Sequence, residues 1–253
     1  MRWHLLRDPL PRPGWQNMAI DQTLLDLAAG QGLAVLRLYR WGPWCLSLGR
    51  HEPALGRYGR ARVEALGVDV VRRPTGGRAV WHARELTYAI AAPARLGSLP
   101  EVYRQAHEML RNAIASLGGA ATLAPAPARH PAPDAGACFA APAGGEVLMQ
   151  GRKVVGSAQV RERGAILQHG AVLLEDDQRL VHELAGEVPD PLPEIPLSTA
   201  LRRRVTWDEM ADAVTAASRA WAADWTPLAP ANIEAQAARH GPRFRDPAWT
   251  WES

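Results

Sequence analysis

Apolar residues recur at helical spacing in several stretches of the chain. The clearest pattern predicts an amphipathic helix over 101–117. Its apolar stripe consists of Val102, Ala106, Leu110, Ala113 and Ile114. A second pattern predicts a helix over 17–29, with Asn17 as its N-cap and with Gly30 and Gly32 at its end. Two further helices are expected, a short one over 59–66 and one over 206–223 that Thr206 and Glu209 open as a capping box.

Shorter apolar runs and alternating patterns predict strands between these helices. The expected strands cover 34–40, 44–49, 68–72, 78–82, 85–92, 146–150, 153–161 and 165–174. Trp41-Gly42-Pro43 joins the first two, and Gly151-Arg152 suits a tight hairpin turn. Within 153–161, period-two alternation places Lys153, Ser157 and Gln159 on one face. That polar face is typical of solvent exposure, and it would also suit the wall of a site.

Residues 121–137 are rich in proline and alanine. Such composition is typical of a linker between domains, and equally of one long functional loop. We predict a single domain over 1–253, in which this stretch is a mobile loop and 206–253 form a helical extension. No repeat of fixed period is present.

Composition narrows the class of protein. With 253 residues, 47% hydrophobic and 22% charged, the chain can bury a sizeable core. No apolar run approaches the ~18 residues of a membrane span, and charge enters too early in Met1–Asp8 for a signal peptide, so a cytoplasmic protein is expected. The net charge of +3 suits an acidic protein partner as well as nucleic acid. No arginine run favours nucleic acid, and Arg202-Arg203-Arg204 suits a solvated helix end.

One lysine, Lys153, stands among 29 basic residues. An ammonium group is compact and its pKa can be tuned, whereas a guanidinium keeps its proton. Lys153 therefore either performs chemistry that arginine cannot, or survives by chance in a chain biased toward arginine.

Three groups of residues could carry chemistry. In Arg72-Arg73-Pro74-Thr75-Gly76-Gly77-Arg78 the paired glycines would let a ligand approach the backbone, although a plain turn has the same composition. Cys138 follows the proline-rich stretch, and a nearby ammonium such as Lys153 would lower its pKa and favour the nucleophilic thiolate; most isolated Cys–Lys pairs are structural.

Two histidines complete the set. His82 ends an expected strand and His169 lies in Leu167-Gln168-His169-Gly170. They are too few for a metal site, and no cysteine spacing supports zinc. Cys45 is expected to be buried and inert.

Taken together, these segments resemble a known superfamily. Arg72–His82 resembles the Arg-Arg-x-x-Gly-Gly signature of the biotin/lipoate protein ligase and lipoyl/octanoyl transferase superfamily. Gly151–Gln159 with Ile166–Gly170 resembles its lysine motif, and Asn17–Asp21 its first helix. Cys138-Phe139, just before the lysine hairpin, is similar to the octanoyltransferases of the LipM type.

The resemblance implies an α+β fold with a central mixed, largely antiparallel sheet flanked by helices, similar to class II synthetase and biotin ligase catalytic domains. It implies that Cys138 and Lys153 are catalytic. Substrate-binding residues would be Arg73, Gly76, Gly77, His82, Ser157 and His169. Cys138 would take octanoyl from acyl carrier protein and pass it to a lysine of a lipoyl domain, such as that of the glycine-cleavage H protein, without metal or cofactor.

Three alternatives stay open within this resemblance. The chain could move octanoyl between lipoyl domains, act as an ATP-dependent lipoate ligase, or bind lipoyl domains or carrier protein without catalysis. Two departures weigh against nucleotide binding, because His82 precedes Ala83 instead of aspartate, and Arg78 replaces a third glycine.

Overall fold

The computed structural model describes residues 2–125, 144–222 and 224–252. Its helices are α1 Gly14–Gln31, α2 Ala54–Tyr58, α3 Arg60–Ala65, α4 Leu99–Ser116, α5 Arg179–Ala185, α6 Leu197–Leu201, α7 Trp207–Ala217, α8 Ala231–Ala237, α9 Gly241–Arg245 and α10 Pro247–Glu252. Short 3₁₀ turns are η1 Ala94–Leu96, η2 Ser218–Ala220 and η3 Ala238–His240. None of these helices is both long and apolar enough to cross a membrane.

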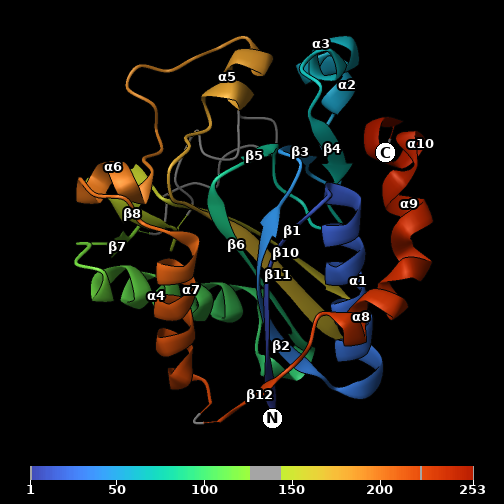
Figure 1. Cartoon of the computed structure of the whole chain (residues 1–253), viewed down its shortest axis with the longest axis vertical. Coiled ribbons are helices and arrows are strands. Elements are labelled where there is room, and N and C mark those ends of the chain that lie inside the picture. Colours follow the sequence, from blue (N-terminus) through green and yellow to red (C-terminus); the bar gives the residue numbers. More distant parts are fainter. Residues whose placement is uncertain (1, 126–143, 223, 253) are drawn as a thin grey trace.

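A six-stranded sheet lies at the centre, in the order β10-β11-β6-β2-β1-β12 (Figure 1). Its strands are β1 Trp3–Arg12, β2 Ala34–Trp41, β6 Glu85–Pro93, β10 Val155–Glu162, β11 Ala165–Leu173 and β12 Trp225–Pro227. Pairing is antiparallel from β10 through β2 and parallel from β2 to β12. The predicted mixed, largely antiparallel sheet flanked by helices is therefore confirmed.

Two three-stranded sheets accompany it. The first consists of β4 Asp69–Arg72, β3 Cys45–Leu48 and β5 Val80–His82. The second consists of β7 Thr122–Leu123, β8 Val147–Met149 and β9 Arg152–Lys153.

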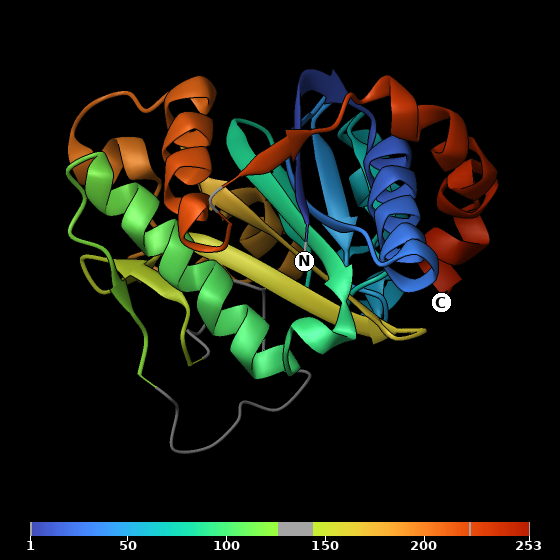
Figure 2. The same cartoon turned by 90° about the horizontal axis from the view of Figure 1, so that it is seen from below.

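Helices cover both faces of the central sheet. Figure 2 shows the sheet between α4 and α7 on one side and α1 with the C-terminal helices on the other. Alternation along β2 fills both cores: Leu36 and Leu38 join the cluster under α4 and α7, whereas Val35 and Tyr39 join the cluster under α1. Because both faces are buried, β2 reads as a nearly continuous apolar run.

The predicted helices exist, with changes at their ends. The helix predicted over 17–29 begins earlier, at Gly14, with Pro13 as N-cap, so Asn17 is not its cap. The Asn17 side chain is buried and donates to the carbonyl oxygens of Arg12 and Arg40. Gly32 caps the end in the left-handed conformation, as expected, whereas Gly30 lies inside the helix. The predicted helix 59–66 is two short helices, α2 and α3.

The strands predicted over 34–40 and 44–49 exist, and they belong to different sheets. The expected strand 153–161 is interrupted at Val154, so Lys153 lies on β9 and only Ser157 and Gln159 share a face of β10. The hairpin before it has Gln150 and Gly151 as its turn residues, both with positive φ, because Arg152 already pairs with Met149.

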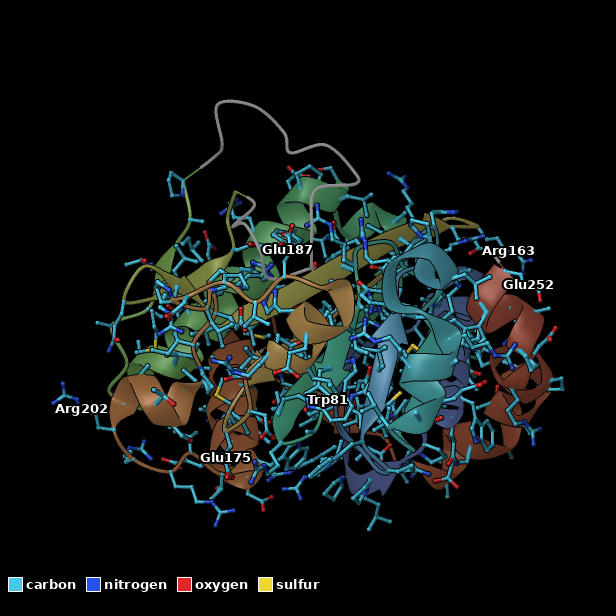
Figure 3. All side chains as sticks on the ribbon, turned by 90° about the horizontal axis from the view of Figure 1, so that it is seen from above. Trp81, Arg163, Glu175, Glu187, Arg202 and Glu252 are labelled. Atoms are coloured by element: carbon cyan, nitrogen blue, oxygen red, sulfur yellow. The ribbon has the colours of Figure 1, made fainter. Side chains whose placement is uncertain are left out.

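The C-terminal region contains the helices α7 to α10 and also the strand β12. Thr206 caps α7 through the Glu209 amide, and α7 ends at Ala217. β12 then joins the central sheet beside β1. Arg202 ends α6, and Figure 3 shows its side chain projecting from the surface, as expected of a solvated helix end. Most of the proline-rich stretch lies outside the described residues, and Thr122–Leu123 form β7.

Candidate active site

Four residues singled out in the sequence line one pocket. Arg73, His82, Ser157 and His169 border one cavity. The remaining wall is largely apolar or glycine. It is formed by Met18, Tyr39, Trp41, Ser47, Val80, Thr87, Gly156, Ala158, Gly170 and Ala171. The pocket wall is therefore mostly apolar, with a few polar groups.

His169 is held between a carboxylate and a hydroxyl. Its Nδ1 lies 2.9 Å from Asp21 Oδ2, and its Nε2 lies 2.6 Å from Thr75 Oγ1. Burial lowers the pKa of His169 below its ordinary value although Asp21 opposes the shift, so the ring is neutral at pH 7. The carboxylate accepts hydrogen from Nδ1, and Nε2 therefore accepts from Thr75.

Asp21 is fixed by a buried charge network that the sequence analysis missed. Arg37, with no exposed surface, donates to Asp21 at 2.8 Å and to Asp8 at 3.0 Å, and Tyr39 donates to Asp21 at 2.9 Å. Burial would raise the pKa of Asp21, but the hydrogen bond from His169 and the charge and hydrogen bond of Arg37 outweigh burial and hold it below its ordinary value. An arginine within the apolar run 34–41 was the available signal, because buried charges need partners.

His82 has the same arrangement on another wall of the pocket. Its Nδ1 donates to Glu85 at 2.8 Å, and its Nε2 lies 2.7 Å from Ser47 Oγ. Burial lowers its pKa, so this ring is also neutral at pH 7. Trp41 stacks on it at 3.9 Å. The resemblance leads one to expect an aspartate directly after His82, where this chain has Ala83. Glu85, two residues further along, supplies the acidic partner instead.

Arg73 connects this histidine to the glycine turn. Its guanidinium donates to Ser47 Oγ at 2.7 Å and to the carbonyl oxygens of Gly76 at 3.2 Å and Arg78 at 2.8 Å. Ser47 therefore accepts from Arg73 and donates to His82. Arg73 fixes the turn and adds a permanent positive charge to the pocket wall.

Gly76 and Gly77 do not line the pocket but lie in the turn beside it. Gly77 has a φ of 84°, and an added Cβ would lie 3.5 Å from the Ala158 Cβ. The Gly77 carbonyl oxygen lies so close to Gly49 that a Cβ atom added at Gly49 would be 1.8 Å from that oxygen. The turn therefore packs tightly against the loop after β3, and glycine at 49 is required for that approach.

Lys153 lies near the pocket but does not line it. Its side chain is 1% exposed, and Nζ lies 2.6 Å from Glu146 Oε1. Burial and the positive charge of Lys153 both lower the pKa of His107 on α4. The ammonium therefore favours the neutral form of the histidine that contacts Ser157. The predicted catalytic role of Lys153 stays a prediction.

Ser157 is the pocket residue that faces α4. Its Oγ lies 2.7 Å from Tyr88 Oη and 2.8 Å from His107 Nε2. Tyr88 and Ser157 meet across Gly170, where an added Cβ would lie 2.5 Å from Ser157 Oγ and 2.9 Å from the Tyr88 ring. Glycine in Gln168-His169-Gly170 thus permits a contact between β10 and β6 over the strand that separates them.

The predicted nucleophile, Cys138, lies outside the described residues. Cys45 is fully buried, and burial raises the pKa of its thiol well above the ordinary value, which confirms the expected inert cysteine. Among the residues that the structure describes, no group of three or more His, Cys, Asp or Glu side chains could hold a metal ion.

Residues 13–219 match the lipoyl protein ligase A/B catalytic domain. The chain belongs to this family. A relative named octanoyltransferase LipM from Symbiobacterium thermophilum is 39% identical over 85% of this chain and 84% of its own length. A second protein of that name, from an Exiguobacterium species, is 36% identical over 83% of each chain. These relatives confirm the prediction of an acyltransferase in the superfamily inferred from the sequence.

A solved structure of this family shows the same fold. A lipoate-protein ligase A structure bound with ATP superposes with a TM-score of 0.81 over 99% of both chains, at 20% identity. Residues from the arginine–glycine motif, from Gly151–Gln159 and from the first helix line this pocket.

Proposed function

We propose that this protein is an octanoyltransferase that acts in protein lipoylation through an acyl-enzyme on Cys138. The observation that carries the proposal is the convergence of Arg73, His82, Ser157 and His169 on one narrow, largely apolar pocket. Support also comes from octanoyltransferases that are 39% and 36% identical to most of the chain.

In the first step, the Cys138 thiolate attacks the thioester carbonyl of octanoyl-acyl carrier protein. A new thioester bond to Cys138 forms, the old one breaks, and the carrier thiolate takes up a proton. In the second step, the neutral amine of a lipoyl-domain lysine attacks the octanoyl-cysteine. The amide bond forms, the bond to sulfur breaks, and the proton that the amine loses goes to the departing Cys138 sulfur. No ATP is consumed because the thioester is already activated.

The polar groups of the pocket suit this chemistry. Two neutral histidines with fixed tautomers and one guanidinium surround the space, and the positive charge of Arg73 would stabilise negative charge on an acyl oxygen. The net charge of +3 favours association with acidic carrier proteins. The proposed acceptor is the lipoyl domain of the glycine-cleavage H protein.

The experiment supplies three donors separately to the same acceptor. The proposal expects transfer from octanoyl-acyl carrier protein without ATP. Transfer only from an octanoylated lipoyl domain would establish an amidotransferase, and efficient use of free octanoate with ATP and magnesium would establish a ligase. Binding of lipoyl domain or carrier protein without transfer from any donor would establish a binding module.

A further inference from the structure

His107 contacts a pocket residue from behind the central sheet. It lies on α4 with no exposed surface, and its Nε2 is 2.8 Å from the oxygen of Ser157, which is half-buried and lines the pocket. Its Nδ1 is 2.7 Å from the carbonyl oxygen of Gly145. A histidine on the apolar stripe of α4 was the only sequence signal for this contact.

The Gly145 carbonyl fixes which nitrogen of His107 carries hydrogen. A carbonyl oxygen can only accept, so Nδ1 must donate to it. Burial and the charge of Lys153 lower the pKa of His107 to about 4, so at pH 7 the ring carries one hydrogen. Nε2 is therefore an acceptor, and the Ser157 hydroxyl must donate its hydrogen to it.

A second chain of hydrogen bonds reaches Ser157 from the opposite side. The Gln159 amide donates to the Leu99 carbonyl oxygen at 3.0 Å and to Gln168 Oε1 at 2.8 Å. The Gln168 amide must then donate to Tyr88 Oη, 2.8 Å away, and the Tyr88 hydrogen must point to Ser157. Backbone carbonyl groups thus fix the direction of the chain at both ends.

These directions leave Ser157 with one kind of binding capacity. A hydroxyl has one hydrogen and two lone pairs. The hydrogen goes to His107 and one lone pair accepts from Tyr88, so in the described part of the chain one lone pair remains. Toward a substrate, Ser157 can accept a hydrogen bond but cannot donate one.

We propose that His107 is a positioning residue that makes Ser157 an acceptor-only group in the pocket wall, where it receives an N–H of the incoming lysine amine. The inference rests on the proposed function. A neutral amine that donates an N–H to Ser157 keeps its nitrogen lone pair for attack on the acyl carbonyl. A carboxylate or a thioester carbonyl offers no hydrogen, so Ser157 selects the nucleophile of the second step and contributes nothing to the first.

The test separates the two half-reactions in His107→Phe and His107→Gln. Phenylalanine keeps the ring but removes the acceptor, which frees the Ser157 hydrogen. In His107→Gln, the glutamine side-chain oxygen can reach the position of Nε2 and restore a hydrogen-bond acceptor for Ser157. His240→Phe is the matched control, because His240 lies on the distant η3 turn, where it contacts Asp26.

Octanoyl-enzyme is formed first, and its decay on addition of lipoyl domain is then followed by intact mass. We expect unchanged acylation in His107→Phe, amine transfer slowed roughly tenfold, and recovery to within about threefold in His107→Gln. Equal slowing of both half-reactions, or equal loss in both variants, would overturn the proposal and leave His107 a structural residue. So would normal amine transfer in a folded His107→Phe protein.

Failure of the proposed function gives a different result. If the wild-type protein never carries octanoyl on Cys138, the acyl-enzyme mechanism is wrong. Transfer to the lipoyl domain is then measured with whichever donor is active. A raised KM or lowered kcat for the acceptor in His107→Phe, restored by His107→Gln, supports the positioning role, and no change contradicts it.

Discussion

At the residue scale, the site depends on which neighbours hold each polar group. The sequence singled out His82, His169 and Ser157, and the structure places all three at one pocket. Glu85, the partner of His82, lies only three residues along the chain. Asp21 and His107 could not be predicted as partners, since each comes from an element distant in the sequence.

Lys153 is the only lysine in the sequence, and this first suggested a chemical role for it. We expect Lys153→Arg to lose most transfer activity, because a guanidinium is broader than the ammonium held against Glu146 and keeps its proton. Lys153→Met should also lower the free energy of unfolding by about 3–5 kcal/mol, as removal of one partner from a buried ion pair does.

A double variant separates the two effects. Lys153→Met with Glu146→Gln should recover part of the stability, measured by urea unfolding, but none of the activity. Normal turnover in Lys153→Arg would make the lysine a compositional accident.

The buried histidines make folding sensitive to acid. His107 titrates at pH about 4 when folded and near 6.5 when unfolded. Between these values the unfolded chain binds a proton that the folded chain does not, so His107 contributes its full stability above pH 6.5 and loses it as the pH falls toward 4. The total loss is on the order of 3 kcal/mol.

Urea unfolding at pH 7.5 and pH 5 checks this linkage. The stability difference between the two pH values should shrink in His107→Gln, with the remainder due to groups such as His82 and His169, whose pKa is also lowered. An identical difference in the variant would show that His107 titrates normally in the folded protein.

At the scale of elements, the pattern of apolar and polar residues predicted where strands lie better than it predicted which strands pair. The strand predicted over 34–40 was recognisable because its residues, apart from Arg37 and Arg40, are apolar on both faces. The sequence did not show that this strand and β3 belong to different sheets, because strand pairing is decided by residues distant in the chain. The short strand β12, which contains proline, has no recognisable pattern and is a strand only because β1 lies beside it.

Gly170 tests the packing between β10, β11 and β6. We expect Gly170→Ala to lower the free energy of unfolding by about 1–3 kcal/mol and to reduce transfer, because the added methyl group would lie 2.5 Å from the Gly156 carbonyl oxygen and from Ser157 Oγ. Gly30→Ala in α1 is the matched control, with nothing within 4 Å of the added atom. It should be neutral or slightly stabilising. Equal behaviour of the two variants would refute this account of the contact.

At the scale of the whole molecule, the C-terminal helix is coupled to the arginine–glycine turn. Arg72, fully buried beside Arg73, donates to the carbonyl oxygens of Thr250 at 2.9 Å, Arg50 at 3.1 Å and Glu52 at 3.0 Å. The double arginine therefore has two roles, since Arg72 holds the C-terminus and Arg73 faces the pocket. The sequence indicated the motif but not this division, which depends on packing over 178 residues of chain.

Removal of residues 247–253 should weaken the site from a distance. It takes away the Thr250 carbonyl oxygen and the buried Trp251, so we expect a lower melting temperature and reduced transfer. Arg72→Lys, which cannot reach several carbonyl groups at once, should produce the same two effects in the full-length chain. A truncated protein with unchanged melting temperature and activity would contradict this coupling.

The central claim is that the protein carries octanoyl on Cys138 between donor and acceptor. Intact mass after mixing with octanoyl-acyl carrier protein, in the absence of ATP, tests it most directly. We expect one octanoyl adduct that Cys138→Ser abolishes, that Cys45→Ser retains, and that disappears when lipoyl domain is added. An adduct on Cys45, or transfer to the lipoyl domain by Cys138→Ser at the wild-type rate, would contradict the account.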